Sequence, residues 1–113
     1  MSSSTAHEID IVTVSASKIN SVDFENLSFG SVFTDHMFVC DFREGKWQQP
    51  QIKPYEPFLI DPSAKVFHYG QAIFEGMKAY KTEQDEVWLF RPDQNLNRLN
   101  KSAVRMAMPE IPS

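Results

Sequence analysis

The chain has 113 residues, of which 42% are hydrophobic, and a net charge of −4. This length supports one compact domain with a modest core, and the apolar content excludes wholesale disorder. The basic residues form no run or stripe, which argues against nucleic acid or an anionic membrane as a partner. The single cysteine, Cys40, excludes an intramolecular disulfide and suits a reducing compartment. No apolar stretch reaches the length of a membrane span, and no secretory signal is recognisable, so we expect a cytoplasmic protein.

The first half of the chain predicts short strands. Residues 1–24 are polar, and we expect a partly disordered lead-in with one β-like patch, IDIVTV. The stretch FTDHMFVCDFREGKW, residues 33–47, is rich in β-formers and contains a hairpin turn candidate, REGKW. The three prolines of QQPQIKPYEP, residues 48–57, predict an extended loop or a sheet edge. FLIDP and AKVFHY, within residues 58–69, are typical of two further short strands.

The second half predicts a hairpin followed by one long helix. MKAYK and EVWLFRP are strands joined by the polar link TEQDE, and QAIFEG before them is a candidate helical turn. A helix is expected over residues 93–107, with Asp93 as its N-cap. Its apolar positions share one stripe at helical spacing: Leu96, Leu99, Ala103, Met106 and Ala107. This order of elements predicts an α+β fold, a mostly antiparallel sheet with the long C-terminal helix packed on one face.

Generic catalytic motifs are absent from the sequence. The three histidines are scattered and have no cysteine partner at metal-ligand spacing, so no metal site is expected. Neither a glycine-rich phosphate loop nor a G-x-S-x-G nucleophile turn occurs. On the helix, Arg98 projects away from the apolar stripe, near Lys101 and Arg105. The pattern alone leaves two interpretations open, a solvated basic face or an arginine that binds an anion.

Four blocks of sequence resemble one enzyme family. HYGQAIFEGMKAYK and LFRPDQNLNRLNKSAVRMAMP, together with FGSVFTDHM and EPFLIDPSAKVFHYG upstream, closely resemble the branched-chain amino acid aminotransferases. These are pyridoxal 5'-phosphate enzymes of fold type IV. The resemblance spans roughly residues 25–112 in the family's order. It implies that residues 25–113 form the family's small N-terminal domain, without the large cofactor-binding domain.

The resemblance also implies roles for individual residues. Arg98 occupies the position of the arginine that binds the cofactor phosphate, and a planar, permanently charged fork suits that dianion. Tyr69 and Phe74 match aromatics that wall the substrate side-chain pocket, and Phe29 is similarly placed. Gly70 and Gly76 would let the backbone turn sharply around this bend. No role is assigned to Glu75 or Lys78.

The implied reaction is amino transfer between leucine, isoleucine or valine and 2-oxoglutarate, in a homodimer. It needs a lysine that forms a Schiff base with the cofactor, and we expect that lysine beyond Ser113. No catalytic residue is therefore assigned within this chain, and we expect the chain alone to be inactive. Alternatives are a non-catalytic interaction module, a truncated product, or another fold type IV member. Of the last, D-amino acid aminotransferase and aminodeoxychorismate lyase are disfavoured by the FTDHM and SAVRMAMP segments.

Overall fold

The computed structural model describes residues 8–112. The chain divides into two compact units, Met1–Leu59 and Ile60–Ser113, called here the first and the second unit. The part of the lead-in expected at residues 1–7 lies outside the described residues. Of the rest of that segment, Asp10–Ile11 form a strand and Ile19–Ser21 a single 3₁₀ turn.

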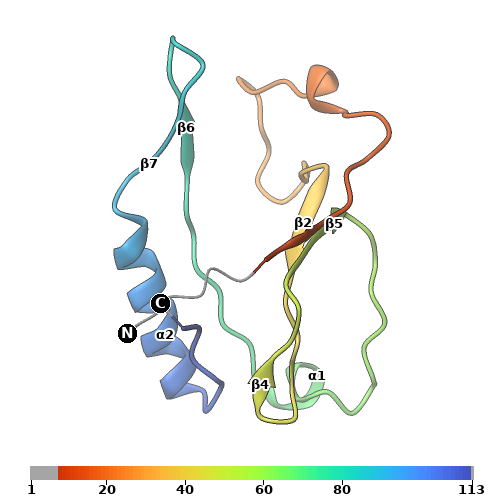
Figure 1. Cartoon of the computed structure of the whole chain (residues 1–113), viewed down its shortest axis with the longest axis vertical. Helices are drawn as coiled ribbons and strands as arrows, with labels where there is room; N and C mark the ends of the chain where they lie inside the picture. Colours follow the sequence, from red (N-terminus) through yellow and green to blue (C-terminus); the bar gives the residue numbers. More distant parts are fainter. Residues whose placement is uncertain (1–7, 113) are drawn as a thin grey trace. The chain divides into compact units, whose positions relative to one another are not determined.

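The first unit is built on a three-stranded sheet in the order β1-β5-β2. Its strands are β1 (Asp10–Ile11), β2 (His36–Val39) and β5 (Gln51–Pro54). β5 runs parallel to β1 and antiparallel to β2, with Phe38 opposite Ile52. Figure 1 shows β2 and β5 lying side by side. The sheet is therefore mixed, and its central strand comes from the proline-rich segment.

The prediction that this proline-rich segment is a loop or an edge is wrong. Pro50 precedes β5 and Pro54 ends it, so the missing N–H groups fall outside the central ladder positions. Proline keeps its carbonyl acceptor, and that of Pro50 accepts a hydrogen bond from the Asp10 N–H at 3.1 Å. The Ile52 carbonyl accepts from the Val12 N–H at 2.9 Å. Two prolines spaced in this way are compatible with a strand that is paired on both sides.

A short hairpin follows the second strand, as predicted. It joins β3 (Phe42–Arg43) and β4 (Lys46–Trp47), which pair antiparallel. The two residues between them, Glu44 and Gly45, both have positive φ, at 54° and 77°. Positive φ at both central positions is the geometry whose twist matches paired antiparallel strands. The REGKW turn is thereby confirmed.

The second unit contains two helices and one hairpin. Its elements are α1 (Lys65–Tyr69), β6 (Ala79–Lys81), β7 (Val87–Leu89) and α2 (Pro92–Arg105). β6 and β7 pair antiparallel as predicted, and Figure 1 shows α2 following the hairpin directly.

The prediction of strands within residues 58–69 is wrong. Residues 58–62 form no regular element, and residues 65–69 form α1. Asp61 accepts hydrogen bonds from both the backbone N–H and the hydroxyl of Ser63, at 2.8 and 2.6 Å, in a local turn before the helix. Gly70 ends the helix in the left-handed conformation with φ 61°. Turn chemistry at both ends thus overrides the strand preference of the apolar residues between. The helical turn expected at residues 71–76 does not form either.

The long helix is confirmed, but its N-cap is not Asp93. Arg91 is the cap residue, with φ 47° and no side-chain capping bond, and Pro92 is the first helical residue. Proline favours that position because its missing N–H has no partner there in any helix. The helix therefore starts one residue earlier than predicted, and Asp93 lies in its first turn, where a carboxylate complements the helix dipole. Its last residue is Arg105, four before Pro109.

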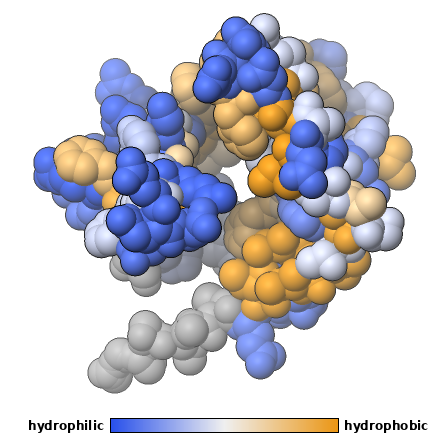
Figure 2. All heavy atoms as spheres, turned by 90° about the horizontal axis from the view of Figure 1, so that it is seen from above, coloured by the Kyte–Doolittle hydropathy of each residue, from blue (hydrophilic) through white to orange (hydrophobic). Residues whose placement is uncertain are grey.

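The described residues bury little apolar surface. Among them Ala103, on the predicted apolar stripe, is the only buried hydrophobic residue, at 2% exposure. Leu96 on the same stripe is 48% exposed. Figure 2 shows hydrophobic side chains, in orange, at the surface. The α+β class is confirmed. Within the described residues, no helix has both the length and the apolar character needed to cross a membrane.

Candidate functional site

A groove in the second unit joins two of the residues that the sequence singled out. Phe74 and Arg98 both line it, with Lys101 and Arg105 from the same helix, and its volume is about 510 Å³. Positions 98, 101 and 105 are separated by three and four residues, so α2 presents three cationic side chains on one face. The remaining lining residues are small or apolar: Ala72, Ile73, Ser102 and Met106. The groove is therefore cationic on its helical side and apolar on the side of the chain segment before β6.

Arg98 is held by a carboxylate that precedes the helix. Its Nε donates to Oε2 of Glu75 at 2.8 Å, and its Nη2 donates to Oε1 of the same residue. The Glu75 side chain is only 9% exposed, whereas that of Arg98 is 69% exposed. Asn95, one turn earlier on α2, donates from Nδ2 to Oε1 of Glu75 at 3.2 Å and to the Gly76 carbonyl at 2.7 Å. Glu75 is thus fixed from two positions of the helix.

The electrostatics of this pair keep both partners charged. The hydrogen bond from Arg98 is the largest influence and, with the Asn95 amide, lowers the pKa of Glu75 from 4.5 to about 2, against an opposing effect of desolvation. The Glu75 carboxylate in turn raises the pKa of Arg98. At neutral pH the carboxylate therefore accepts hydrogen bonds only, and the guanidinium only donates them.

Arg98 has donor capacity left after it binds Glu75. A guanidinium carries five N–H groups, and this one donates to Glu75 from Nε and Nη2. Among the described residues, no hydrogen bond occupies its Nη1 group. An anion in the groove would meet these remaining donors together with the charges of Lys101 and Arg105. This set of donors fits a phosphate group.

The other aromatic residues singled out by sequence lie elsewhere. Tyr69 is the last residue of α1 and is 81% exposed, but it does not line the groove around Arg98. Phe74 is 91% exposed, so its ring is not buried among residues 8–112. Phe29 belongs to the first unit, in a turn closed by the Ser31 N–H and the Ser28 carbonyl at 3.3 Å, and its side chain is fully exposed. Of the four predicted residues, the structure brings together Phe74 and Arg98.

Sequence reasoning missed Glu75 and Asn95. Glu75 stands alone as a charge within the apolar run AIFEGM, and Asn95 is three residues before Arg98 on the helix. A lone carboxylate in an apolar segment was the available signal, because a shielded charge requires a partner. The identity of the partner, 23 positions away, was not available from local pattern.

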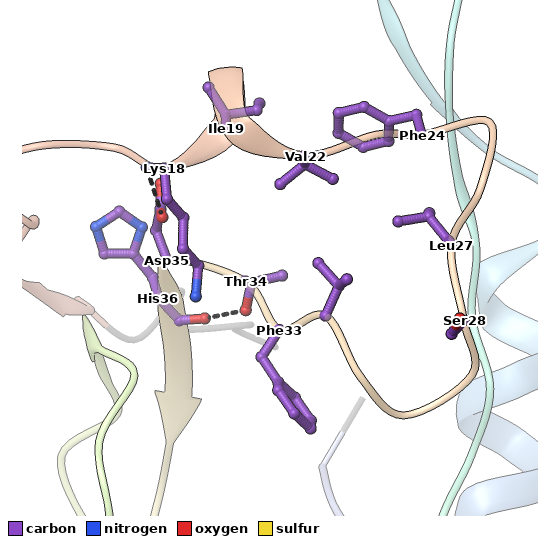
Figure 3. A pocket seen from close by; sticks show the side chains of 11 residues that line it. Lys18, Ile19, Val22, Phe24, Leu27, Ser28, Phe33, Thr34, Asp35 and His36 are labelled. Atoms are coloured by element: carbon purple, nitrogen blue, oxygen red, sulfur yellow. Dashed lines mark hydrogen bonds between the residues drawn. The ribbon is translucent and has the colours of Figure 1, made fainter.

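The first unit holds a second pocket, of a different character. It has a volume of about 710 Å³ and is largely apolar, as Figure 3 shows for Ile19, Val22, Phe24 and Leu27. Asp35 lies at its edge and accepts hydrogen bonds from the Ser17 hydroxyl and from the Lys18 N–H at 3.2 Å. The Ser17 hydroxyl is the main reason why the pKa of Asp35 is lowered. Within residues 8–112, no group of three or more His, Cys, Asp or Glu side chains could hold a metal ion.

The second unit thus presents a cationic groove suited to an anionic group, within a small α+β fold. No protein-family model matches the chain. Individual proteins do: it is 58% identical over 90 residues to branched-chain-amino-acid transaminase 1 of Bacillus subtilis. It is 52% identical over 101 residues to branched-chain-amino-acid aminotransferase 2 of the same organism. Over 84 residues it is 51% identical to the cytosolic branched-chain-amino-acid aminotransferase of Saccharomyces cerevisiae.

The matches cover 79%, 88% and 74% of this chain respectively. They cover 25%, 28% and 22% of those relatives. The curated homologues of this chain are therefore branched-chain-amino-acid aminotransferases, and the chain matches an N-terminal portion of that enzyme. It spans about a quarter of the length of the curated relatives it matches.

Proposed function

We propose that this chain supplies part of the ligand site of a branched-chain amino acid aminotransferase. That enzyme transfers an amino group between leucine, isoleucine or valine and 2-oxoglutarate. The observation that carries the proposal is the 58% identity to a transaminase over 90 residues, 79% of the chain, which is joined by the groove of Arg98 and Phe74. The names of the relatives state the substrate class, and the groove supplies the matching chemistry, cations beside an exposed aromatic.

Arg98 is the proposed contact to the phosphate of pyridoxal 5'-phosphate. Its donors beyond the Glu75 pair, with Lys101 and Arg105 beside it, support this role. When bound, the cofactor supplies an electron sink for the bonds at the substrate's α-carbon. The contribution of this chain is to bind and orient the phosphate end. The lysine that forms the Schiff base in this family matches no position here, so we propose that the 113-residue chain alone does not transaminate.

Phe74, Tyr69 and Phe29 are the proposed walls of the substrate pocket. The first two are 91% and 81% exposed, which leaves their rings available to a ligand or to another part of the protein. A branched aliphatic side chain would bury apolar surface against such rings. Discrimination among the three substrates would be weak, because one methylene in an apolar pocket is worth about 1–3 kcal/mol.

We also propose how the complete enzyme assembles and in which compartment it is located. Exposed apolar residues such as Phe58 and Leu59, at 67% and 103%, support burial against further protein, and we propose a homodimer for the complete enzyme. In that assembly α2 would pack on one face of a mostly antiparallel sheet, as the family's small domain implies. The free Cys40 supports a reducing, cytoplasmic location.

A chimaera tests the proposal. The 90 matched residues of the Bacillus subtilis transaminase 1 would be replaced by those of this chain, and transamination of leucine, isoleucine and valine measured with 2-oxoglutarate. We expect the chimaera to be active and the 113-residue chain with added cofactor to be inactive. The same chimaera carrying Arg98→Ala serves as the matched control and should require far more cofactor. A folded chimaera that binds cofactor yet turns over none of the three amino acids would contradict the proposed function.

A further inference from the structure

Arg98 does not stand free in its groove, because Glu75 occupies one edge of its guanidinium. The two hydrogen bonds leave from Nε and Nη2, the pair of nitrogens that forms one side of the planar fork. Nη1 has no hydrogen-bond partner among the described residues. A planar group held along one edge has its other edge fixed in direction as well.

The carboxylate itself is more firmly placed than the arginine it holds. Its side chain is 9% exposed against 69% for Arg98, and Asn95 bonds to both Glu75 and the Gly76 carbonyl. The Gly76 carbonyl therefore helps to fix the Asn95 side chain, Asn95 helps to fix Glu75, and Glu75 holds Arg98. An exposed arginine on a flexible side chain gains its orientation from this support.

We propose that Glu75 is a positioning residue that aims the free edge of the Arg98 guanidinium at the phosphate group of the ligand. This inference rests on the proposed function, since it takes a phosphate ester as the anion of the groove. It adds a role that the sequence left unassigned: Glu75 itself donates nothing to the ligand and acts through Arg98. Asn95 supports the same arrangement, because it fixes the carboxylate.

Whether Glu75→Gln strengthens or weakens phosphate binding distinguishes a positioning role of Glu75 from a simple effect of its charge. Glu75→Gln removes a negative charge beside a site for an anion, and on charge alone phosphate binding should become tighter. If Glu75 orients Arg98, the same change should weaken phosphate binding, because the guanidinium then samples many directions. A purely structural role would weaken phosphorylated and unphosphorylated ligands alike.

The experiment uses the 113-residue chain and two probes, pyridoxine 5'-phosphate and pyridoxine. Neither carries an aldehyde, so neither reacts with lysine side chains. Dissociation constants and the Nε–H resonance of Arg98 would be followed by nuclear magnetic resonance of ¹⁵N-labelled protein. The variants are Glu75→Gln, the conservative Glu75→Asp, and Glu83→Gln as a matched loss of charge at an exposed glutamate of the same unit.

We expect Glu75→Gln to weaken binding of pyridoxine 5'-phosphate about 5-fold or more, with pyridoxine unchanged. The Arg98 Nε–H signal should broaden in that variant, Glu75→Asp should restore part of the affinity, and Glu83→Gln should match the wild type. Equal or tighter phosphate binding by Glu75→Gln would overturn the inference and leave the proposed function standing. A wild-type chain that binds both probes equally would overturn the inference together with the assignment of Arg98 to the phosphate.

Discussion

In each unit of this protein a carboxylate, Asp35 or Glu75, accepts hydrogen bonds from residues distant in sequence, and the two differ in the donors that their partners keep free for a ligand. In the first unit Asp35 accepts from the Ser17 hydroxyl and the Lys18 N–H. Both partners are neutral, and each gives its single donor to the carboxylate. In the second unit Glu75 accepts from Arg98, whose guanidinium keeps further donors.

This difference separates a contact that serves the fold from one that can serve a ligand. The Asp35 bonds connect the segment around the 3₁₀ turn to the start of β2, next to a pocket that is largely apolar. The Glu75 pair lies beside a groove with two further cations. A depressed carboxyl pKa occurs in both places, so it does not by itself identify a functional site.

The largest effect on phosphate binding is expected from removing Arg98. An arginine of the first unit, Arg43, provides the matched control. Arg43 also pairs with a carboxylate, Asp41 at 2.6 Å, and is similarly exposed. Arg98→Ala should weaken binding of pyridoxine 5'-phosphate at least about 10-fold, since a charged hydrogen-bonding partner is lost. Arg43→Ala should leave it unchanged. Titration calorimetry or nuclear magnetic resonance would measure both, and equal losses in the two variants would break the contrast.

A smaller effect is expected at the end of α1. Gly70 has φ 61°, and a Cβ there would meet no atom within 4 Å, so Gly70→Ala adds backbone strain without a clash. It should lower the free energy of unfolding by about 1–2 kcal/mol. Gly76 has the same open surroundings without a positive φ, so Gly76→Ala is the matched control and should stay within about 0.5 kcal/mol. Urea denaturation followed by tryptophan fluorescence would measure both. Equal stabilities would show that φ at Gly70 is not constrained.

Removal of an aromatic ring should lower the free energy of unfolding in the first unit but leave it nearly unchanged in the second. Phe33 stacks on Tyr55 with ring centroids 5.2 Å apart, whereas Phe74 is 91% exposed. Phe33→Ala should lower the free energy of unfolding by about 1 kcal/mol, and Phe74→Ala should change it by less than about 0.5 kcal/mol. In the chimaera described above, Phe74→Ala should instead alter the relative rates with leucine and valine. A large loss of stability from Phe74→Ala would assign it to packing.

The smallest effect is a difference in acid sensitivity. Glu75 has its pKa lowered from 4.5 to about 2, so the pair with Arg98 is fully formed above pH 4.5 and is lost as pH falls through about 2. Its contribution to stability therefore disappears between those values. For Asp35 the pKa is also lowered, so its bonds persist below the ordinary value of 3.8 before they are lost. Carboxyl ¹³C shifts during an acid titration would report each group. An ordinary midpoint near 4.5 for Glu75 would contradict the pair.

The sequence by itself determined the secondary-structure elements that depend only on neighbouring residues. The β3–β4 turn follows from Glu44 and Gly45, the β6–β7 hairpin from two strand patterns around a polar link, and α2 from its helical spacing after Pro92. The resemblance singled out Arg98 and Phe74 as candidates, because family motifs are contiguous in the chain, and both residues line one groove. In each case the information lies within a few residues, so the pattern suffices.

Only the tertiary structure decided the features that join distant residues. β5 became the central strand because β1, about 40 positions away in sequence, pairs with it, and proline content alone does not reveal that. Glu75 is hydrogen-bonded to Arg98, which lies 23 positions further along the chain. Tyr69 ends α1 and is not among the residues that line the groove. Hydrogen bonds between distant segments depend on the tertiary fold, and local secondary-structure propensity does not specify which distant residues meet.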